Sequence, residues 1–377
     1  MMDFKDKKVL VIGLGASGCA AAGFLAGKGA IVRVTENAGG PDIGRRAETL
    51  KSPRISIETG GHTKGFCADA EIAVVSPGVD VKSRELTAVL PEGIRIIGEL
   101  ELGFMFCPAP VVAVTGTNGK STTVELIGRI LSFSGKHVVV CGNIGPPFTG
   151  RVEELRRDSI AVVEVSSFQL ETIRDFRPEI AVLLNVTEDH YDRHRSYNEY
   201  KKEKFRIFMN QDKNDWAVVY SDMRADGSLK GIKSRLAFFG RDKGMVKIKG
   251  ADIIAEAGPG EPGFIMKTSE VPLRGGHNLD NVLCSILVSR IMGVDSGPVR
   301  KALSTFKGLE HRFESVGFLN GVEYIDDSKA TNIDATKRAL ESLNKKTVLI
   351  AGGRDKGGDY RSILPLIREK VKMLVVM

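Results

Sequence analysis

Short apolar runs alternate with longer segments of helical periodicity along most of the chain. The runs consist mainly of Val, Ile and Leu, and the segments between them are long enough for crossover helices. Because continuous apolar strands of this kind are buried on both faces, the pattern predicts an α/β fold with parallel sheets. The predicted strands are Val9–Ile12, Ile31–Val34, Ile72–Val75, Val111–Val114, Val138–Val140, Ala161–Val165, Ala181–Leu184, Val218–Tyr220, Thr347–Ile350 and Met373–Val376.

Residues 234–272 depart from this pattern. The region is rich in glycine, and its segments Met245–Ile248 and Gly263–Met266 alternate between apolar and polar positions. This alternation predicts a small antiparallel excursion. Breaks near Cys107–Pro110 and Gly308–His311 suggest domain limits, and 377 residues are enough for two or three domains.

The composition is that of an ordinary globular protein, with 42% hydrophobic and 27% charged residues, and it excludes a disordered or collagen-like chain. The net charge of +7 comes from scattered basic residues, so it fits an acidic small-molecule substrate at least as well as nucleic acid. We expect no signal peptide, because the first residues mix acids with bases and lack its basic, apolar and small-residue order. We expect no membrane span, because no run of about 18 apolar residues is present. Five cysteines without CxxC spacing argue against a disulfide framework or structural zinc and predict a cytoplasmic location.

A first glycine cluster, Gly13–Gly18 (GLGASG), lies between a predicted strand and a helical run. Glycine at these positions permits a tight turn and lets the backbone approach a phosphate at the helix N-terminus. Glu36 ends the next strand, about where a ribose-binding carboxylate stands in a dinucleotide site. By itself the cluster leaves three interpretations open: a nicotinamide or flavin cofactor, another nucleotide ligand, or close packing.

A second glycine cluster, Thr115–Thr122 (TGTNGKST), leads from a predicted strand into an apolar helix. This is the order of a P-loop, in which backbone amides cradle phosphates; Lys120 can reach the β- and γ-phosphates and Ser121 offers a hydroxyl to Mg²⁺. Val114 stands where the generic pattern requires glycine, so a glycine turn with an incidental lysine is the alternative. A P-loop beside an N-terminal nucleotide fold suggests a ligase with ATP as one substrate.

Polar side chains follow several predicted strands, where ligands bind in open α/β sheets. Glu164 lies near the end of an apolar strand and can hold Mg²⁺ against ATP phosphates; the alternative is a buried acid satisfied by hydrogen bonds. In the run Asn185–His194, His190 is open between a core histidine and a ligand, and His194 is expected in a solvated loop.

Two later segments carry further candidates. Tyr197–Phe208 is predicted as an amphipathic helix with three clustered lysines, and the spacing does not distinguish Lys204 from its neighbours. The run Ile325–Asn332 follows a short strand and is expected to begin a helix. Its Asp327 and Lys329 are either ligand contacts in an inter-domain cleft or capping and surface residues.

Together these segments closely resemble the Mur ligase family. The motifs occur in the family's order across nearly the whole chain, and the shortened P-loop is the form that this family uses. They are GLGASG (13–18), SPG (76–78), TGTNGKST (115–122), GNIG (142–145), EVSSFQLE (164–171), NVTEDHYDR (185–193), YKKEKFRI (200–207), GHNLDN (276–281), HRFE (311–314) and DSKATN (327–332).

The resemblance implies a three-domain α/β fold. A Rossmann-like domain for the UDP substrate is expected over residues 1–98, a central P-loop ATP-binding domain over residues 99–308, and an incomplete C-terminal Rossmann-like domain over residues 309–377. The implied activity is ATP-dependent addition of D-glutamate to UDP-N-acetylmuramoyl-L-alanine through an acyl phosphate, in cytoplasmic peptidoglycan precursor synthesis. ATP is then a co-substrate, two Mg²⁺ ions are implied, and we expect a monomer with no nucleic-acid or membrane partner.

The resemblance also implies roles for individual residues. Lys120, His190 and Lys204 are the implied catalytic residues, and Lys204 is expected as a carbamate. The implied Mg²⁺ ligands are Ser121, Glu164, His190 and the Lys204 carbamate. The implied ATP contacts are Gly116, Thr117, Asn118, Gly119, Lys120, Ser121, Thr122, Asn278, Asn281, Arg312 and Asp327. The implied contacts to the other substrates are Gly15, Ala16, Ser17, Glu36, Ser76, Pro77, Gly78, Asn143, Ser166, Lys329, Thr331 and Lys356.

Two features depart from the family pattern. Relatives often have Asp-Thr-Arg after the second strand, in contact with uracil, whereas this chain has Glu36-Asn37-Ala38, so its uracil contacts are expected to differ. The sequence ends at Met377, in a predicted second strand of the third domain, before the family's loop that holds the D-glutamate carboxylates. We therefore expect nucleotide binding with weak or absent ligase turnover.

Other functions remain as alternatives. The nearest are a sibling Mur ligase that adds another amino acid and a folylpolyglutamate synthase, which shares the ATP domain. An NAD-dependent dehydrogenase would use Gly13–Gly18 and Glu36 for its cofactor. A non-catalytic nucleotide-binding regulator would not depend on Lys120 for its function.

Overall fold

The computed structural model describes residues 3–191, 193–255, 263–353 and 359–377. Its contacts divide the chain into two units, which are described separately. The first unit comprises Met1–Ala113, His137–Glu179 and Arg206–Asn210. The second unit comprises Val114–Lys136, Ile180–Phe205 and Gln211–Met377.

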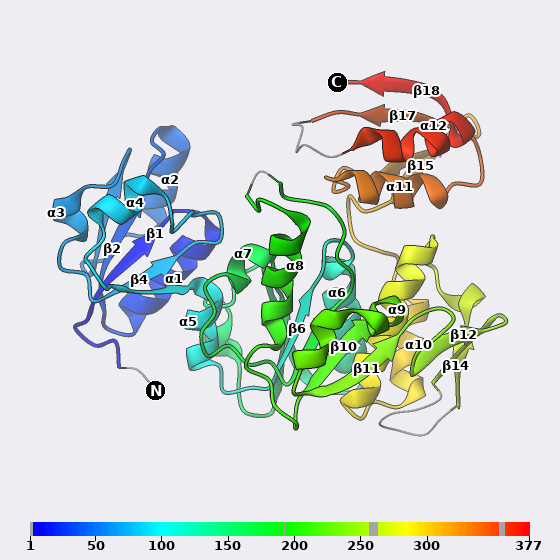
Figure 1. The fold of residues 1–377 in the computed structure, drawn as a ribbon, viewed down its shortest axis with the longest axis horizontal. Helices are drawn as coiled ribbons and strands as arrows, with labels where there is room; N and C mark the ends of the chain where they lie inside the picture. The colour runs from blue at the N-terminus through cyan, green and yellow to red at the C-terminus, as the bar shows by residue number, and fades with distance from the viewer. Residues whose placement is uncertain (1–2, 192, 256–262, 354–358) are drawn as a thin grey trace. The chain divides into compact units, whose positions relative to one another are not determined.

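The N-terminal part of the first unit is a parallel five-stranded sheet with the order β3-β2-β1-β4-β5. Its strands are β1 (Lys8–Ile12), β2 (Ile31–Glu36), β3 (Ile55–Thr59), β4 (Ile72–Val75) and β5 (Arg95–Gly98). Its helices are α1 (Ala16–Gly27), α2 (Pro41–Thr49), α3 (Lys64–Cys67) and α4 (Arg84–Val89) (Figure 1).

The apolar runs of this sheet form its core. Leu10 and Ile12 of β1 pack with Ala73 and Val75 of β4 in one buried cluster. Helix α1 contacts β1, β2 and β4. Because β1 and β4 lie next to each other, the segments that follow them meet at one edge of the sheet.

The remainder of the first unit contains α5 (Glu99–Phe106), β7 (His137–Gly142), β8 (Ser159–Glu164) and α7 (Ser167–Leu170). Strands β7 and β8 are parallel, with Gly142 opposite Glu164. Two short 3₁₀ helices complete this part, η1 (Val152–Glu154) and η2 (Arg206–Phe208). The pairing of β7 with β8 brings the segments after both strands close together.

The second unit contains a mixed sheet. Strands β9 (Ile180–Leu183), β10 (Trp216–Tyr220) and β11 (Arg235–Phe239) are parallel. The antiparallel strands β12 (Val246–Lys249), β13 (Asp252–Ala255) and β14 (Gly263–Lys267) continue it, so the predicted antiparallel excursion is confirmed.

Three helices of this unit pack together: α6 (Lys120–Phe133), α9 (Gly276–Ile291) and α10 (Ser296–Ser304). Helix α9 also lies against β10, β11 and β12 (Figure 1). Strand β6 (Val111–Thr115) leads into α6 and crosses the limit between the units, and α8 (Tyr197–Phe205) follows β9. The 3₁₀ helices are η3 (Ser221–Ala225), η4 (Gly227–Gly231) and η5 (Thr268–Glu270).

The C-terminal segment begins with an antiparallel hairpin of β15 (Glu314–Leu319) and β16 (Val322–Asp326). After α11 (Ile333–Glu341), strand β17 (Thr347–Ala351) pairs in parallel with β18 (Val371–Val376). The 3₁₀ helix η6 (Tyr360–Ile363) and α12 (Leu364–Lys370) connect these strands.

The ten predicted strands are all confirmed, most of them extended by one or two residues. Two local predictions were wrong. The polar run after β16 does not itself begin a helix, because α11 starts only at Ile333 and its N-cap is Asn332. His194 is buried against the ring of Tyr200 rather than solvated. Within the described ranges, every helix is too short or too polar to cross a lipid bilayer.

Candidate active site

The first glycine turn joins β1 to α1 in the first unit. Gly15 is the N-cap of α1, and Ala16 and Ser17 open its first turn. Gly13 has a φ of +96°, and a Cβ on Gly18 would lie 1.9 Å from the carbonyl oxygen of Gly13. Glycine is therefore required for close packing of the turn as well as for its backbone conformation.

Glu36, at the end of β2, binds this turn directly. Its Oε2 accepts a hydrogen bond from the amide of Leu14 at 2.7 Å, and its Oε1 accepts one from the amide of Ala38 at 2.9 Å. On the other side, the Ser76 hydroxyl donates to the carbonyl oxygen of Gly13 at 3.4 Å. The carboxylate thus ties the glycine turn to the end of β2.

A cavity of about 280 Å³ lies beside this turn. The structure brings the predicted residues Gly13, Glu36 and Gly78 together in its lining, with Ser76 and Pro77 directly before Gly78. The lining also includes Asn37 and His62, and the His62 ring shares a 2.7 Å hydrogen bond with Thr35. His62 was missed because it lies in the loop after β3, which carries no recognisable motif.

A second polar group of the first unit forms where β7 and β8 end. Glu164 is only 1% exposed, and its Oε1 accepts a hydrogen bond from Nδ2 of Asn143 at 2.9 Å. Ser166 is the N-cap of α7 and forms a capping box with Gln169. The predicted substrate contact Asn143 and the predicted Mg²⁺ ligand Glu164 are therefore neighbours. The hydroxyl of Ser166, also a predicted substrate contact, caps α7.

The second glycine cluster joins β6 to α6 and belongs, from Val114 onward, to the second unit. Gly119 has a φ of +87° and precedes α6, whose first turn contains Lys120, Ser121 and Thr122. The Lys120 ammonium donates to the carbonyl oxygens of Gly116 and Thr117, each at 2.9 Å. A strand, a glycine loop, a lysine and a helix N-terminus thus stand in the arrangement that binds phosphate.

The segment after β9 holds this loop in place. The Asn185 side chain accepts from the amide of Asn118 at 2.9 Å and donates to its carbonyl oxygen at 3.0 Å. The Thr117 amide donates to the Asn185 carbonyl oxygen at 3.1 Å, and the Thr187 amide donates to the Thr117 hydroxyl at 3.0 Å. The amides of Thr117 and Asn118, both predicted ATP contacts, are therefore already hydrogen-bonded to Asn185.

Lys204 contacts the same loop from α8. It is 1% exposed, its ammonium donates to the Gly116 carbonyl oxygen at 2.9 Å, and it lies 4.6 Å from the ring centre of Tyr200. The neighbouring Lys201 pairs instead with Asp226, and Lys202 is exposed. The fold thus buries at the loop the lysine that the family resemblance points to and that spacing alone does not single out.

His190 lies in the polar segment after β9, with a φ of +57° that is uncommon for a residue other than glycine. Its amide donates to Oδ1 of Asp189 at 2.8 Å, and its ring is half-buried. The Asp189 carboxylate that accepts this bond is buried.

Of the two predicted residues of α9, Asn281 lies against the loop at Gly119, and Asn278 is hydrogen-bonded to Asn281. Asn281 donates to the side chain of Asn278 at 3.3 Å, and a Cβ on Gly119 would lie 2.3 Å from Oδ1 of Asn281. Asn281 is buried and Asn278 is half-buried. The Asn281 side chain would therefore have to move if position 119 carried a Cβ, and the positive φ of Gly119 favours glycine there in any case.

Of the predicted residues of the C-terminal segment, Arg312 contacts the first turn of α6, and Asp327 is half-buried beside Phe313. Arg312 donates to the Ser121 hydroxyl at 2.9 Å. The Asp327 carboxylate accepts from the amide of Phe313 at 3.0 Å, and burial raises the pKa of this carboxyl group to about 6. Lys329 and Thr331 are exposed, and Lys356 lies outside the described residues.

Three family models match successive parts of the chain. They are the MurD-like N-terminal domain of Mur ligases over residues 7–98, the Mur ligase middle domain over residues 114–289, and the Mur ligase glutamate ligase domain over residues 311–377. A curated relative from Pelotomaculum thermopropionicum, named UDP-N-acetylmuramoylalanine–D-glutamate ligase, is 44% identical over 382 residues, which cover 100% of this chain and 84% of the relative.

The chain belongs to the Mur ligase family. A relative of the same name from Koribacter versatilis is 41% identical over 377 residues, covering 98% of this chain and 83% of its own. The three-domain fold is shared with UDP-N-acetylmuramate-alanine ligase MurC from Thermotoga maritima, which has a TM-score of 0.62 at 18% identity and covers 98% of this chain and 90% of its own. MurF ligase from the same organism, in complex with ADP, has a TM-score of 0.59 at 17% identity, with coverage of 100% and 89%.

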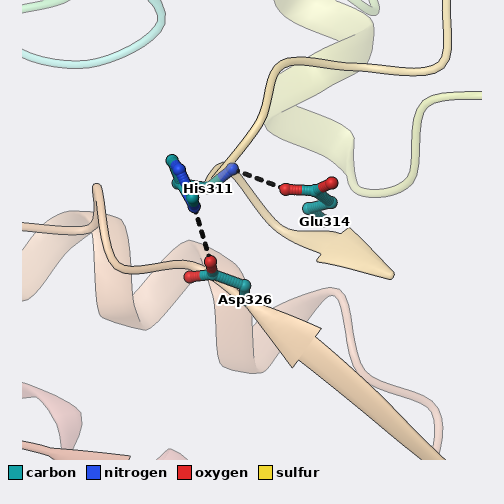
Figure 2. Close-up of side chains that lie close together, drawn as sticks. All are labelled: His311, Glu314 and Asp326. Atoms are coloured by element: carbon teal, nitrogen blue, oxygen red, sulfur yellow. Dashed lines mark hydrogen bonds and ion pairs between the residues drawn. The ribbon is translucent and has the colours of Figure 1, made fainter. Parts of the chain in front are cut away.

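A different cluster in this Mur ligase was not predicted. Within the described part of the chain, one group of three side chains of metal-ligating type lies close together: His311, Glu314 and Asp326 (Figure 2). The His311 ring and amide are hydrogen-bonded to Asp326 and Glu314, each at 2.7 Å. These bonds raise the pKa of His311 and lower the pKa of Asp326 to about 2. The cluster is an exposed hydrogen-bonded turn at the start of the C-terminal segment.

Sequence reasoning also missed the residues that hold the nucleotide loop of this Mur ligase. They are Asn185, Thr187, Asp189, Asn332 and Asp334, and each contributes a hydrogen bond to the loop or to the segment after β9. Asn185 follows a strand end, which is a usable signal. Asn332 and Asp334 lie far away in the sequence, and no local pattern connects them with residue 118.

Proposed function

We propose that this Mur ligase joins D-glutamate to UDP-N-acetylmuramoyl-L-alanine with conversion of ATP to ADP and phosphate. The observation that carries the proposal is the loop at Gly116–Lys120, whose lysine and helix N-terminus suit a triphosphate. The names of the relatives, at 38–44% identity over nearly the whole chain, supply the identity of the other two substrates.

The chemistry follows from the poor reactivity of a carboxylate. A carboxylate oxygen of the muramoyl-L-alanine group attacks the γ-phosphorus of ATP, and the bond from that phosphorus to ADP breaks. The resulting acyl phosphate carries a good leaving group. The amine of D-glutamate attacks its carbonyl carbon, the carbon–oxygen bond to phosphate breaks, the amine loses a proton, and an amide is formed. Binding two anionic substrates side by side requires cations around the phosphates.

Lys120 is the proposed cation for the β- and γ-phosphates. Its ammonium lies on the carbonyl oxygens of Gly116 and Thr117, which keeps it at the loop. Arg312 supplies a second positive charge beside the first turn of α6 through its bond to Ser121. Asn278, Asn281 and Asp327 are the proposed contacts to the remaining part of ATP, since α9 touches the loop at Gly119.

The side chains proposed for Mg²⁺ suit a hard cation, because hydroxyl and carboxylate oxygens predominate among them. Ser121, Glu164, His190 and a carbamate on Lys204 would hold two ions, which would neutralise phosphate charge when bound. Glu164 is a buried carboxylate at a strand end, and Lys204 is buried with its amine on the loop. Carbamylation would turn this amine into an anionic oxygen ligand.

The first unit is the proposed site of the UDP-sugar peptide. The cavity beside Gly13, Glu36 and Gly78 would take the uridine, with Ala16 and Ser17 at the phosphates. Because both Glu36 oxygens already accept backbone amides, Asn37 and His62 are the better-placed groups for the uracil edge. Asn143, Lys329, Thr331 and Lys356 remain proposed contacts to the reacting groups.

The proposal is tested by incubating the chain with ATP, Mg²⁺ and UDP-N-acetylmuramoyl-L-alanine in the presence of hydroxylamine. An acyl phosphate reacts with hydroxylamine to a hydroxamate, so this readout does not require D-glutamate. We expect hydroxamate from the wild type and none from Lys120→Ala. A panel of amino acids added in place of hydroxylamine then separates the sibling ligases, since only D-glutamate should give amide product. Tight NADH binding without any effect of ATP would instead support a dehydrogenase.

Three coarser predictions accompany this function. The domain limits 1–98, 99–308 and 309–377 are retained as the proposed division of the chain. We propose a cytoplasmic location, because nucleotide-linked cell-wall precursors and ATP are available there. The chain is also proposed to be a monomer. Sedimentation of the purified chain with and without substrates tests the monomer.

A further inference from the structure

The N-terminus of α11 is hydrogen-bonded to the nucleotide loop. Nδ2 of Asn118 donates to Oδ2 of Asp334 at 2.8 Å, and Oδ1 of Asn118 accepts from Nδ2 of Asn332 at 3.2 Å. Both ends of the Asn118 amide are therefore held by two residues of the C-terminal segment. Its backbone is held separately by Asn185, so Asn118 connects three parts of the chain.

The same helix N-terminus reaches the segment of His190. Nδ2 of Asn332 also donates to Oδ2 of Asp189 at 2.8 Å, while Oδ1 of Asp189 accepts from the amide of His190. Asp334 accepts from the hydroxyl of Thr187 at 3.4 Å. One short stretch of α11 thus bonds to the loop proposed for ATP and to the segment that carries a proposed metal ligand.

The bonds from Asn332 to Asn118 and Asp189 are not needed to cap α11. Oδ1 of Asn332 accepts from the amide of Ala335 at 2.8 Å and so provides the N-cap of α11. Serine, threonine or aspartate would cap equally well, but none of them offers the amide group with which Asn332 donates to Asn118 and Asp189. Arg338 donates to Asp334 at 2.9 Å and orients its carboxylate.

We propose that Asn332 and Asp334 are positioning residues of the ligase: they set the nucleotide loop and the His190 segment in register with each other through Asn118 and Asp189. The inference rests on the proposed function, because it assigns these residues to the binding of ATP with Mg²⁺. It makes the phosphate site depend on the C-terminal segment, although the loop itself belongs to the central part of the chain.

The test is calorimetric titration of the full chain with ATP, once with Mg²⁺ and once with EDTA. Asn332→Asp keeps the capping oxygen but removes the donor and places a charge opposite Asp189. We expect it to weaken ATP binding with Mg²⁺ about tenfold and to affect binding in EDTA much less. A residue that only caps α11 would not alter the difference between the two conditions.

Asp334 provides a second, independent variant. We expect Asp334→Ala to weaken ATP binding with Mg²⁺ about tenfold and Asp334→Asn to restore part of it, because asparagine keeps an acceptor for Asn118. Asn118→Ala should have a similar effect, and the double variant Asn118→Ala/Asp334→Ala should be no weaker than either single variant. Glu341→Gln, an exposed change on the same helix, is the matched control and should bind like the wild type.

The outcomes separate the inference from the proposed function. If the wild type binds ATP with Mg²⁺ and the Asn332 and Asp334 variants bind equally well, the inference is wrong and the function stands. If the wild type itself shows no ATP binding, the proposed function fails. Fully additive effects in the double variant would also overturn the inference, since the two side chains would then act separately.

Discussion

The two glycine turns of this Mur ligase have the same backbone plan but different surroundings. Each follows a buried parallel strand, contains glycines that close packing requires, and opens a helix. The first is bound by the carboxylate of Glu36, and its cavity is lined by two further acids, Asp80 and Glu85. The second is contacted by the cationic groups of Lys120 and Lys204.

This difference indicates that the backbone of a glycine turn determines where a phosphate can approach. The charges of the neighbouring side chains determine how much negative charge a bound ligand can carry. A triphosphate needs cations, which the second turn has. Acidic neighbours suit the neutral hydroxyl and amide groups of a nucleoside better than a triphosphate. The comparison therefore predicts that substitutions at one turn affect one nucleotide and spare the other.

The largest effect is expected for Lys120→Ala. Removing the ammonium should weaken ATP binding roughly 100-fold, about 3 kcal/mol, since a charge-assisted contact to phosphate is lost. Binding of a uridine nucleotide should stay within a factor of about two, because a different turn holds it. Calorimetric titration with each nucleotide measures both. Equal losses for the two nucleotides would show that the turns are not independent.

Gly18→Ala is the corresponding disruptive substitution in the first glycine turn. Its Cβ would lie 1.9 Å from the Gly13 carbonyl oxygen, so we expect a loss of stability of about 1–3 kcal/mol and loss of uridine nucleotide binding. Gly23→Ala on the same helix is the control, because its Cβ would meet no atom within 4 Å. This control should stabilise the protein by about 0.5–1 kcal/mol in denaturant unfolding.

Asp327→Asn tests the charge of a proposed ATP contact. Burial raises the pKa of Asp327 to about 6 from 3.8, so its contribution to stability is greatest below pH 3.8 and is lost as the pH rises through 6. Asparagine keeps the acceptor for Phe313 without the charge. After solvent screening is allowed for, we expect the free energy of unfolding to rise by about 1 kcal/mol at pH 7.5. We also expect weaker ATP binding. Unfolding curves at pH 4.5 and 7.5 check the sign, because the gain should shrink at the lower pH.

The smallest effect is expected at the exposed pair of His311 and Asp326. The raised pKa of His311 means that its contribution is present below pH 6.5 and is lost as the pH rises through the folded value. The pKa of Asp326, lowered to about 2, means that its contribution is lost as the pH falls from 3.8 through 2. The pair therefore stabilises the turn between about pH 4 and 6.5. Asp326→Asn should return the pKa of His311 to its usual range in an NMR titration, with uridine nucleotide binding unchanged.

The strands and the positions of the two glycine turns could be predicted from local pattern. Continuous apolar runs identified all ten predicted strands, and glycine spacing placed each turn between a strand and a helix, because both signals come from neighbouring residues; nucleotide binding at Lys120 stays a prediction. The resemblance to the Mur ligases, which the relatives confirm, rests on the same short motifs. His194 was misplaced because nothing local shows that α8 turns Tyr200 toward it.

Other features depend on groups distant in sequence. Three lysines occur within four positions of α8, and their spacing does not separate them; the family resemblance points to Lys204, and packing against the loop distinguishes it from Lys201 and Lys202. Asn118 and Asp334 are separated by more than two hundred residues, yet their side chains share a hydrogen bond.

The amino-acid order alone was enough to establish the α/β architecture and the family, and to predict Lys120 as the phosphate-binding lysine, since periodicity, steric demands on glycine and charge are properties of short segments. Which lysine faces the loop, which carboxylate binds a backbone amide, and which helix end reaches Asn118 became known only from the folded chain. Burial and hydrogen-bond partners are set by the elements that pack together, and residues distant in the sequence supply them.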